Sequence, residues 1–190
     1  MTDEELMRAV CNGDQSAYKA IVTKHLKPIS HYAYRMLGSS RETEDIAQET
    51  FLRLWINATK WQPEKSSLTT WLHRITHNLC IDHLRKHSHV QTQESFSEEE
   101  AEPNRQQSFA QEGDRGAAEK LQRAFRELPE NQRSALMLCH YQGFSNKEAA
   151  AIMAISVTAL ESAIARAKRA LRERLVLDGI DATTLLEELH

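Results

Sequence analysis

The sequence predicts an all-α protein made of two small helical domains joined by a flexible acidic linker. Apolar residues recur at intervals of three and four along nearly every long segment, as on the buried side of a helix. No alternating run rich in Val, Ile and Thr appears, and six Gly and four Pro leave little material for strands and tight turns. Acidic residues, paired Gln, Pro and Gly interrupt the apolar period only between about residues 88 and 116. The predicted boundaries are 1–90 for the N-terminal domain, 91–117 for the linker, 118–176 for the C-terminal domain and 177–190 for an acidic tail.

Charge is distributed unevenly along these parts. The net charge of −3 argues against a simple nucleic-acid binder, but residues 1–92 carry a net +2 and residues 118–176 a net +4. The acid is concentrated in residues 93–117 and 177–190, with −5 and −4. Two mildly basic bodies therefore remain once the linker and the tail are set aside.

The ends and the cysteines indicate a cytoplasmic protein without a metal or disulfide framework. The start, Met-Thr-Asp-Glu-Glu, is acidic where a secretory signal is basic, and no apolar run approaches the roughly 20 residues that cross a bilayer. The odd, scattered cysteines Cys11, Cys80 and Cys139 stand among apolar neighbours, so they are expected to be small buried hydrophobic residues. No cofactor and no enzymatic activity are expected.

The C-terminal domain has the spacing of a helix-turn-helix. Leu128-Pro129-Glu130 is a typical helix start, and that helix is expected to run to Gly143. Ser145-Asn146-Lys147-Glu148 forms a capping box, which begins a short second helix at Asn146. After a break at Ala154-Ile155, Ser156 caps a third helix that starts near Val157.

The third helix is expected to bury one side and to present a basic side. The expected buried residues are Leu160, Ile164, Ala167 and Leu171, and the basic residues are Arg166, Lys168, Arg169 and Arg172. The early turns of such a helix meet base edges and the later turns meet phosphate. Three core helices with solvated basic residues remain the alternative interpretation.

In the N-terminal domain, a helical projection of residues 42–58 separates two faces. The expected core side holds Ile46, Ala47, Thr50, Phe51, Leu54 and Trp55, and the other side holds Asp45, Gln48, Glu49, Leu52 and Ile56. Large aliphatic residues among carboxylates on the wet side suggest a docking surface for another protein. A plain surface with stray apolar residues is the alternative.

The next helix, about 69–86, is expected to bury Leu72, Ile75 and Leu79. Its opposite side is expected to hold Arg74, Asn78, Ile81 and Arg85. With Trp61 and Trp71 ahead of them, these groups suit an unpaired nucleic-acid strand, because cations meet phosphate and flat rings meet bases. Tryptophans at such positions also commonly belong to a core.

Together, these segments resemble the extracytoplasmic-function (ECF) sigma factors, which retain regions 2 and 4 of the sigma-70 superfamily. The N-terminal match is EDIAQETFLRLW at 44–55 and LTTWLHRITHNLCIDHLRK at 68–86. The C-terminal match comprises Leu128-Pro129 with Gln132-Arg133, Phe144-Ser145 with Glu148-Ala149-Ala150, and the segment 156–172. Each piece is short, but their order around an acidic linker is specific. The resemblance covers about residues 5–90 and 118–175.

The resemblance implies an alternative sigma factor that binds core RNA polymerase and directs promoter-specific initiation. The residues that it assigns to docking on the β′ clamp are Asp45, Gln48, Glu49, Leu52 and Trp55. Those that it assigns to the −10 DNA are Trp61, Thr70, Trp71, Arg74, Asn78, Asp82, Arg85 and Lys86, with a base held by the loop 61–70. Those on the −35 side are Ser145, Lys147, Thr158, Glu161, Ser162, Arg166, Arg169 and Arg172. The implied partners also include the β flap and an anti-sigma factor that is often membrane-tethered, without membrane insertion of this chain.

Two departures from the family pattern limit what the resemblance transfers. Many members carry Lys and Arg where this chain has Glu161 and Ala163, so their −35 sequence does not carry over. The acidic tail has no role in the core motif; its Ile180, Leu185, Leu186 and Leu189 suit either a short amphipathic helix or a frayed end.

Two other functions are compatible with parts of the sequence. A self-sufficient helix-turn-helix regulator explains residues 128–172 but leaves the face from Asp45 to Trp55 without a purpose. A metalloenzyme is suggested by His73 and His77 at i and i+4 with Cys80 three further on, although no acidic base accompanies them in an HExxH arrangement.

Overall fold

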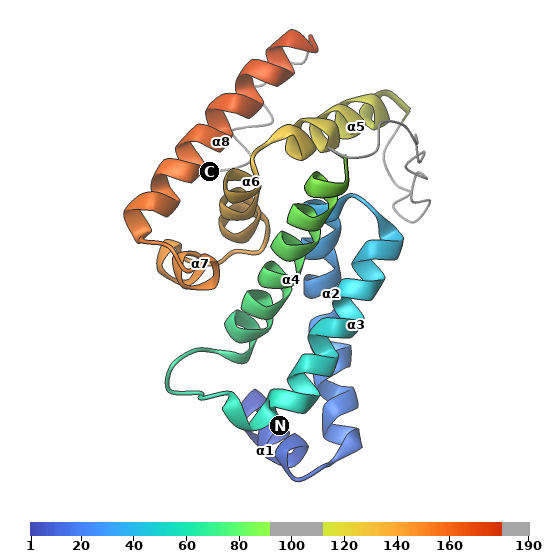
Figure 1. The fold of residues 1–190 in the computed structure, drawn as a ribbon, viewed down its shortest axis with the longest axis vertical. Helices are drawn as coiled ribbons and strands as arrows, with labels where there is room; N and C mark the ends of the chain where they lie inside the picture. The colour runs from blue at the N-terminus through green and yellow to red at the C-terminus, as the bar shows by residue number, and fades with distance from the viewer. Residues whose placement is uncertain (92–111, 180–190) are drawn as a thin grey trace. The chain divides into compact units, whose positions relative to one another are not determined.

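The structure, a computed structural model, describes residues 1–91 and 112–179. The chain divides into two compact units, Met1–Phe96 and Ser97–His190, called unit 1 and unit 2 below. All regular elements within the described ranges are helical (Figure 1), which confirms the all-α prediction. The predicted linker falls largely outside these ranges, but Gln91 ends the last helix of unit 1 and residues 112–117 already belong to the first helix of unit 2.

Unit 1 is a bundle of α1 (Asp3–Cys11), α2 (Gln15–Leu37), α3 (Ser40–Asn57) and α4 (Leu68–Gln91), with a 3-10 turn η1 (Ala58–Lys60) after α3. The three long helices pack pairwise against one another, and α1 packs on α2 and η1. Residues at the turns determine where one helix ends and the next begins. Gly38 ends α2 with φ +71°, a conformation that costs glycine little, and the Ser39 hydroxyl accepts the Glu42 N–H at the start of α3.

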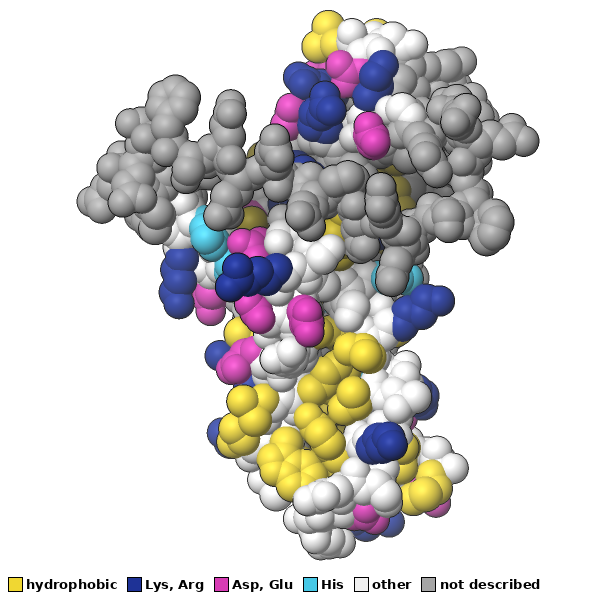
Figure 2. Space-filling model, turned by 90° about the vertical axis from the view of Figure 1, so that its right-hand side faces the viewer, with side chains coloured by type: hydrophobic (Ala, Val, Ile, Leu, Met, Phe, Trp, Pro, Cys, Tyr) yellow, Lys and Arg dark blue, Asp and Glu magenta, His cyan; other side chains and the backbone are white. Residues whose placement is uncertain are grey.

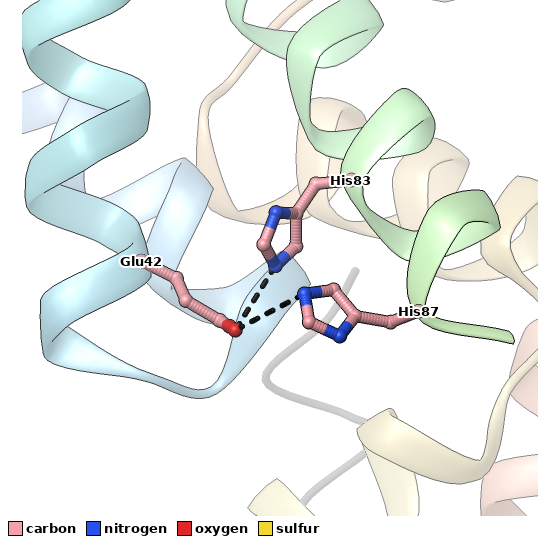
Figure 3. A group of neighbouring side chains, drawn as sticks. All are labelled: Glu42, His83 and His87. Atoms are coloured by element: carbon pink, nitrogen blue, oxygen red, sulfur yellow. Dashed lines mark ion pairs between the residues drawn. The ribbon is translucent and has the colours of Figure 1, made fainter. Parts of the chain in front are cut away.

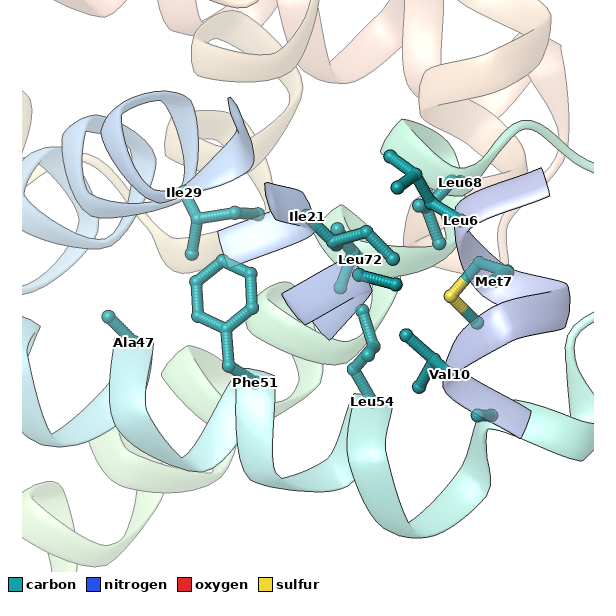
Figure 4. Packing of buried hydrophobic residues seen from close by; sticks show 12 residues of the cluster. Leu6, Met7, Val10, Ile21, Ile29, Ala47, Phe51, Leu54, Leu68 and Leu72 are labelled. Carbon is teal, nitrogen blue, oxygen red and sulfur yellow. The ribbon is translucent and has the colours of Figure 1, made fainter. Parts of the chain in front are cut away.

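One hydrophobic core joins all four helices of unit 1, and Figure 4 shows side chains from each of them meeting in it. Ile21 and Ile29 of α2, Leu54 of α3 and Leu72 of α4 are completely buried. Each such side chain contributes about 1.5–3 kcal/mol of burial free energy. Met7 of α1 is buried in the same cluster, so the short first helix covers one end of the core.

Helix α4 is buried on a wider arc than its sequence pattern predicts, because it packs against both α2 and α3. The helical projection correctly placed Leu72 and Leu79 in the core, but it was wrong for Ile75 and Ile81. Ile81, expected on the wet side, is only 7% exposed, whereas Ile75, expected in the core, is half-buried. A helix with two neighbours buries more than the usual apolar stripe.

Two buried polar contacts attach α4 to its neighbours. The hydroxyls of Thr76 and Thr50 lie 3.1 Å apart between α4 and α3. Each hydroxyl has one proton, so one donates across the interface while the other donates to a carbonyl one turn back on its own helix. Between α4 and α2, the Tyr32 hydroxyl lies 2.8 Å from His77 Nδ1. Buried polar groups satisfied in this way fix the relative register of packed helices.

Burial changes the titration of two side chains on α4. Desolvation, aided by the positive charge of Arg85, lowers the pKa of His77 to about 4. Desolvation also raises the pKa of the Cys80 thiol to about 12, as suits an inert core cysteine. The prediction of burial is correct for Cys80, but it is wrong for Cys11, which is exposed at the end of α1, and Cys139 is half-buried.

The His77 shift predicts that unit 1 loses stability in mild acid. Between about pH 6.5 and 4 the unfolded chain binds a proton at this position and the folded chain does not, so stability falls as the pH falls. From pH 7 to pH 5 the loss from this residue is about 2 kcal/mol. Urea unfolding of the full chain at both pH values should show it, and His77→Gln should reduce the pH dependence even if it lowers stability at pH 7. An unchanged pH dependence in that variant would contradict the assignment.

Unit 2 contains α5 (Glu112–Glu127), α6 (Glu130–Leu136), a π-type turn η2 (Met137–Tyr141), α7 (Asn146–Met153) and α8 (Val157–Leu177). Helix α8 is central, since α5, α6 and α7 all pack against it. Arg133 of α6 is buried and donates from Nη2 to the carbonyls of Arg126 and Leu128. These carbonyls lie at and just beyond the end of α5, where a cation is favoured.

The predicted helix-turn-helix is confirmed in detail. Ser145 and Glu148 form the capping box, and α7 starts at Asn146. Ser156 accepts the Ala159 N–H at the start of α8. The two helices are bent by 98° at their turn, within the roughly 90–120° of this motif. The turn depends on Ala154, which ends α7 in the left-handed region at φ +54°.

Ala154→Gly should therefore stabilise unit 2, by about 0.5–1 kcal/mol, because glycine adopts this conformation without the strain of a Cβ. Ala151→Gly is the matched control: that residue is exposed in the interior of α7, and the substitution should destabilise by a similar amount. Urea unfolding measures both. Destabilisation by Ala154→Gly would show that the turn does not strain its alanine.

Two further predictions concern the membrane and the tail. Within the described ranges no helix alone is both long and apolar enough to cross a bilayer; α7 and α8 meet that test only when taken together across their bend. Helix α8 ends at Leu177, and residues 180–190, for which the sequence suits either a short helix or a frayed end, lie outside the described residues.

Candidate functional site

The exposed face of α3 carries large aliphatic side chains among polar ones. Leu52 is 49% exposed and Ile56 65%, and Asp45 and Gln48 are exposed on the same side of the helix. Glu49 is half-buried and its carboxylate accepts from Arg53 Nε at 2.9 Å, one turn along α3. Figure 2 shows hydrophobic side chains gathered on the face of unit 1 that is turned to the viewer, with charged groups beside them. We call Asp45, Gln48, Glu49, Leu52 and Trp55 the α3 face.

The helical projection placed Trp55 on the core side of α3. In the structure, Trp55 lies at the edge of the α3 face instead. The indole is 37% exposed and packs edge-on against the ring of Tyr18, with centroids 5.1 Å apart. Tyr18 in turn donates to the Phe51 carbonyl at 3.0 Å, one helical turn before Trp55. The tyrosine from α2 therefore covers part of the indole, and the rest of the indole lies at the surface.

The exposed side of α4 is polar, with a basic surplus. At 100° per residue, its candidate residues other than Thr70 lie within an arc of about 120°, opposite the buried side. The side chains that are exposed there are Arg74, Asn78, Asp82, Arg85 and Lys86, and Trp71 is half-buried on the same arc. The sequence-based assignment thus corresponds to one continuous surface, here called the α4 face.

A short loop, residues 61–67, precedes this face. The Trp61 indole N–H donates to the Ser66 carbonyl at 3.2 Å and closes the loop, while Gln62, Pro63, Glu64 and Lys65 are exposed. Trp61 and Trp71 both pack against the core cluster, and part of each residue is exposed.

Thr70 differs from the other −10 candidates because it is buried. Its N–H and its hydroxyl are both bonded to the Ser67 hydroxyl, at 3.1 Å and 3.0 Å. This contact lies where the loop ends and α4 starts, so Thr70 stabilises the end of the loop from its buried side.

In unit 2, the −35 candidates are all exposed. Thr158, Glu161 and Ser162 lie in the first turns of α8, followed on the same side by Arg166, Arg169 and Arg172. The opposite side is buried at Leu160, Ala167 and Leu171, as predicted, whereas Ile164 is only half-buried. We call the exposed side the α8 face.

Two neighbouring side chains are engaged within unit 2. The Ser145 hydroxyl is bonded to Glu148 in the capping box, while Lys147 beside it is exposed. Arg174 bonds Glu127 of α5 at 3.0 Å and approaches Asp178, so it belongs to the packing of α8 on α5 rather than to the α8 face.

The predicted metal candidates His73 and His77 are engaged in hydrogen bonds inside unit 1. His73 Nδ1–H donates to the Thr69 carbonyl at 2.8 Å, and His77 contacts Tyr32 as described above. The described residues instead bring together Glu42, His83 and His87, from α3 and α4 (Figure 3). The i, i+4 spacing of the two histidines is visible in the sequence, but nothing local points to Glu42.

Both units match known family models. Residues 21–90 match Sigma-70 region 2, and residues 118–171 match Sigma-70, region 4. The ECF RNA polymerase sigma factor SigE of Mycolicibacterium smegmatis is 32% identical over 183 residues, which cover 92% of this chain and 69% of the relative. The chain belongs to the ECF sigma factors. SigF of Caulobacter vibrioides, another ECF sigma factor, is 31% identical over 188 residues that cover 92% of this chain and 97% of that protein.

Solved structures share the fold of this sigma factor. The structure of CnrH in complex with the cytosolic domain of CnrY has a TM-score of 0.70 at 24% identity, covering 93% of this chain and 98% of that one. The Bartonella quintana sigma factor RpoE, in complex with the anti-sigma factor NepR, has a TM-score of 0.68 at 24% identity, covering 85% and 98%. ECF sigma factors are transcription initiation factors.

Proposed function

We propose that this alternative sigma factor binds core RNA polymerase through the α3 face and directs initiation by contacting the −10 DNA with the α4 face and the −35 DNA with the α8 face. The observation that carries the proposal is that the residues assigned from the sequence gather on three separate surfaces: two faces of unit 1 and one of unit 2. A self-sufficient helix-turn-helix regulator would need only the last of these.

The decisive experiment is to add the purified chain to core polymerase and to map the 5′ ends of the RNAs made from genomic DNA. We expect a discrete set of start sites, preceded by common −10 and −35 sequences, that core polymerase alone does not use. If the chain does not associate with core polymerase but still binds DNA site-specifically, the regulator is the correct interpretation.

Docking of the α3 face on the β′ clamp is supported by its composition. Leu52 and Trp55 offer apolar area, and Gln48 and Asp45 offer polar groups at its margin, as in a typical protein interface. None of these side chains fills the core, so they are available to a partner.

Replacing both Gln48 and Leu52 by alanine should weaken binding to core polymerase by at least about tenfold, because truncating a single hot-spot side chain of an interface costs about 2 kcal/mol or more. The unfolding free energy should change little, since both residues are exposed. Leu177→Ala, at an exposed leucine of unit 2, is the matched control. Equal affinities of the double variant and the control for core polymerase would disprove the docking assignment.

For the −10 DNA, we propose that Arg74 and Arg85 meet phosphates while Asn78 and the 61–67 loop meet bases of the separated strand. The exposed loop residues and the half-exposed rings of Trp61 and Trp71 flank the α4 face. Thr70 acts indirectly, by holding the loop end through Ser67.

For the −35 DNA, we propose that Thr158, Glu161 and Ser162 approach base edges, with Lys147 and the three arginines on phosphates. Glu161 accepts from the amino group of cytosine more readily than from other base edges, which favours C in the site. The 98° bend of the motif suits this docking, since it separates α7 from the helix that enters the groove.

Changing Arg166, Arg169 and Arg172 to glutamine should flatten the salt dependence of −35 binding by about one unit of logarithmic slope per lost phosphate contact. The preferred sequence should stay the same, because phosphates carry no sequence information. The control is Arg174→Gln, since Arg174 is paired with Glu127 and Asp178. Holoenzyme binding to a −35 duplex across a salt series measures the slope, and an altered sequence preference would make the arginines base readers.

We also propose that an anti-sigma factor controls this protein in the cytoplasm, by covering one or more of the three faces. The support is by similarity: RpoE and CnrH have each been solved with a partner, and the one bound to CnrH is a cytosolic domain. A membrane-tethered regulator, rather than membrane insertion of the sigma factor, fits that pairing.

A further inference from the structure

Three potential metal ligands, Glu42 of α3 and His83 and His87 of α4, converge within unit 1. His83 Nε2 lies 3.0 Å and His87 Nε2 lies 3.7 Å from the same oxygen, Oε1 of Glu42 (Figure 3). The three ligand atoms all lie within 4.8 Å of one another. Two imidazoles from successive turns of α4 thus point their outer nitrogens at one carboxylate oxygen from α3.

Glu42 is directed to these histidines although its position in α3 suits a different contact. It is the third residue after the cap Ser39, the position from which a glutamate returns to the cap backbone in a capping box. Glu5 of α1 and Glu148 of α7 do so, at 2.7 Å and 2.9 Å. In α3 the Glu42 carboxylate instead extends toward α4, where it lies beside His83 and His87.

The spacing of the three atoms suits a small divalent ion. Zn²⁺ binds imidazole nitrogen and carboxylate oxygen at about 2.0–2.2 Å in tetrahedral geometry, which places neighbouring ligand atoms about 3.3–3.5 Å apart. The two distances to Glu42, 3.0 Å and 3.7 Å, bracket this separation. Two histidines and one glutamate are also a donor set that zinc uses with a fourth position left to water.

The state of His83 gives a second, independent indication. Its Nε2 is shielded from solvent and makes no hydrogen bond of acceptable geometry within the described residues, although Glu42 Oε1 lies 3.0 Å away. A buried ring nitrogen without a directed hydrogen bond is costly, and a metal ion would satisfy it. His87 is more than half exposed, so the site is open to entry of an ion and to a water ligand.

We propose that Glu42, His83 and His87 bind a divalent transition-metal ion, with Zn²⁺ as the best match. The ion fixes the first turn of α3 to the C-terminal part of α4, just before the chain leaves unit 1. On the helical projection the two histidines lie on the side of α4 opposite Asn78 and Arg85. Since imidazoles must be neutral to bind metal, occupancy should fall as the pH falls.

The test is calorimetric titration of the full chain with ZnCl₂, in a Cys11→Ser background that removes the exposed thiol. Titration with Co²⁺ in the same background reports coordination through its visible absorption bands. The variants are Glu42→Gln, His83→Gln and His87→Gln. The matched controls are Glu44→Gln, in the same turn of α3, and His31→Gln, on α2; both residues are exposed.

We expect one saturable Zn²⁺ site, with Co²⁺ bands of a tetrahedral or five-coordinate ion. Loss of any one ligand should weaken binding at least as much as loss of an outer-shell partner does, about 10–100-fold, and the controls should bind like the parent. Circular dichroism verifies folding, and the exposed His87 provides a ligand variant that a folding defect cannot obscure. Absence of saturable binding in the parent, or unchanged affinity in His87→Gln and Glu42→Gln, would overturn the proposal.

Discussion

The packing of α4 against both α2 and α3 is the constraint on which unit 1 depends. Successive residues make the attachment: Thr76 contacts Thr50 of α3, and His77 contacts Tyr32 of α2. Because both contacts are polar and buried, a shift of α4 by one residue would leave unpaired groups in the core at a cost of about 1–3 kcal/mol each. The rotation of α4 is thereby fixed, and with it the narrow arc that presents Arg74, Asn78 and Arg85 to solvent.

In unit 2, mainly local signals determine which side of α8 is exposed to solvent. Helix α8 is buried by three neighbours along Leu160, Ala167 and Leu171, and its remaining side is the α8 face. The caps at Ser145 and Ser156 set where the two helices of the motif begin, and Ala154 bends the chain between them. In both units, a helix that is packed on one side has its exposed candidate residues confined to the other.

How far the sequence predicts this structure depends on how local the deciding interaction is. The caps and the starts of α7 and α8 are correct to the residue, because a capping box involves only four consecutive residues. The burial of Ile81 is missed because periodicity cannot reveal that a helix has two neighbours. The exposure of Trp55 depends on Tyr18, and the convergence of Glu42 on two histidines depends on another helix, so neither can be read along the chain.

The central claim is that three weak surfaces on two small units become one promoter-specific protein only when polymerase fixes their spacing. Titration of a promoter duplex, chosen from the mapped start sites, with the free chain and with reconstituted holoenzyme at the same salt tests it most directly. The free chain should bind weakly and with little specificity, and the holoenzyme more tightly by about 10²–10⁴-fold, as expected when a second contact becomes intramolecular. Tight, sequence-specific binding by the free chain, equal to that of the holoenzyme, would contradict the account.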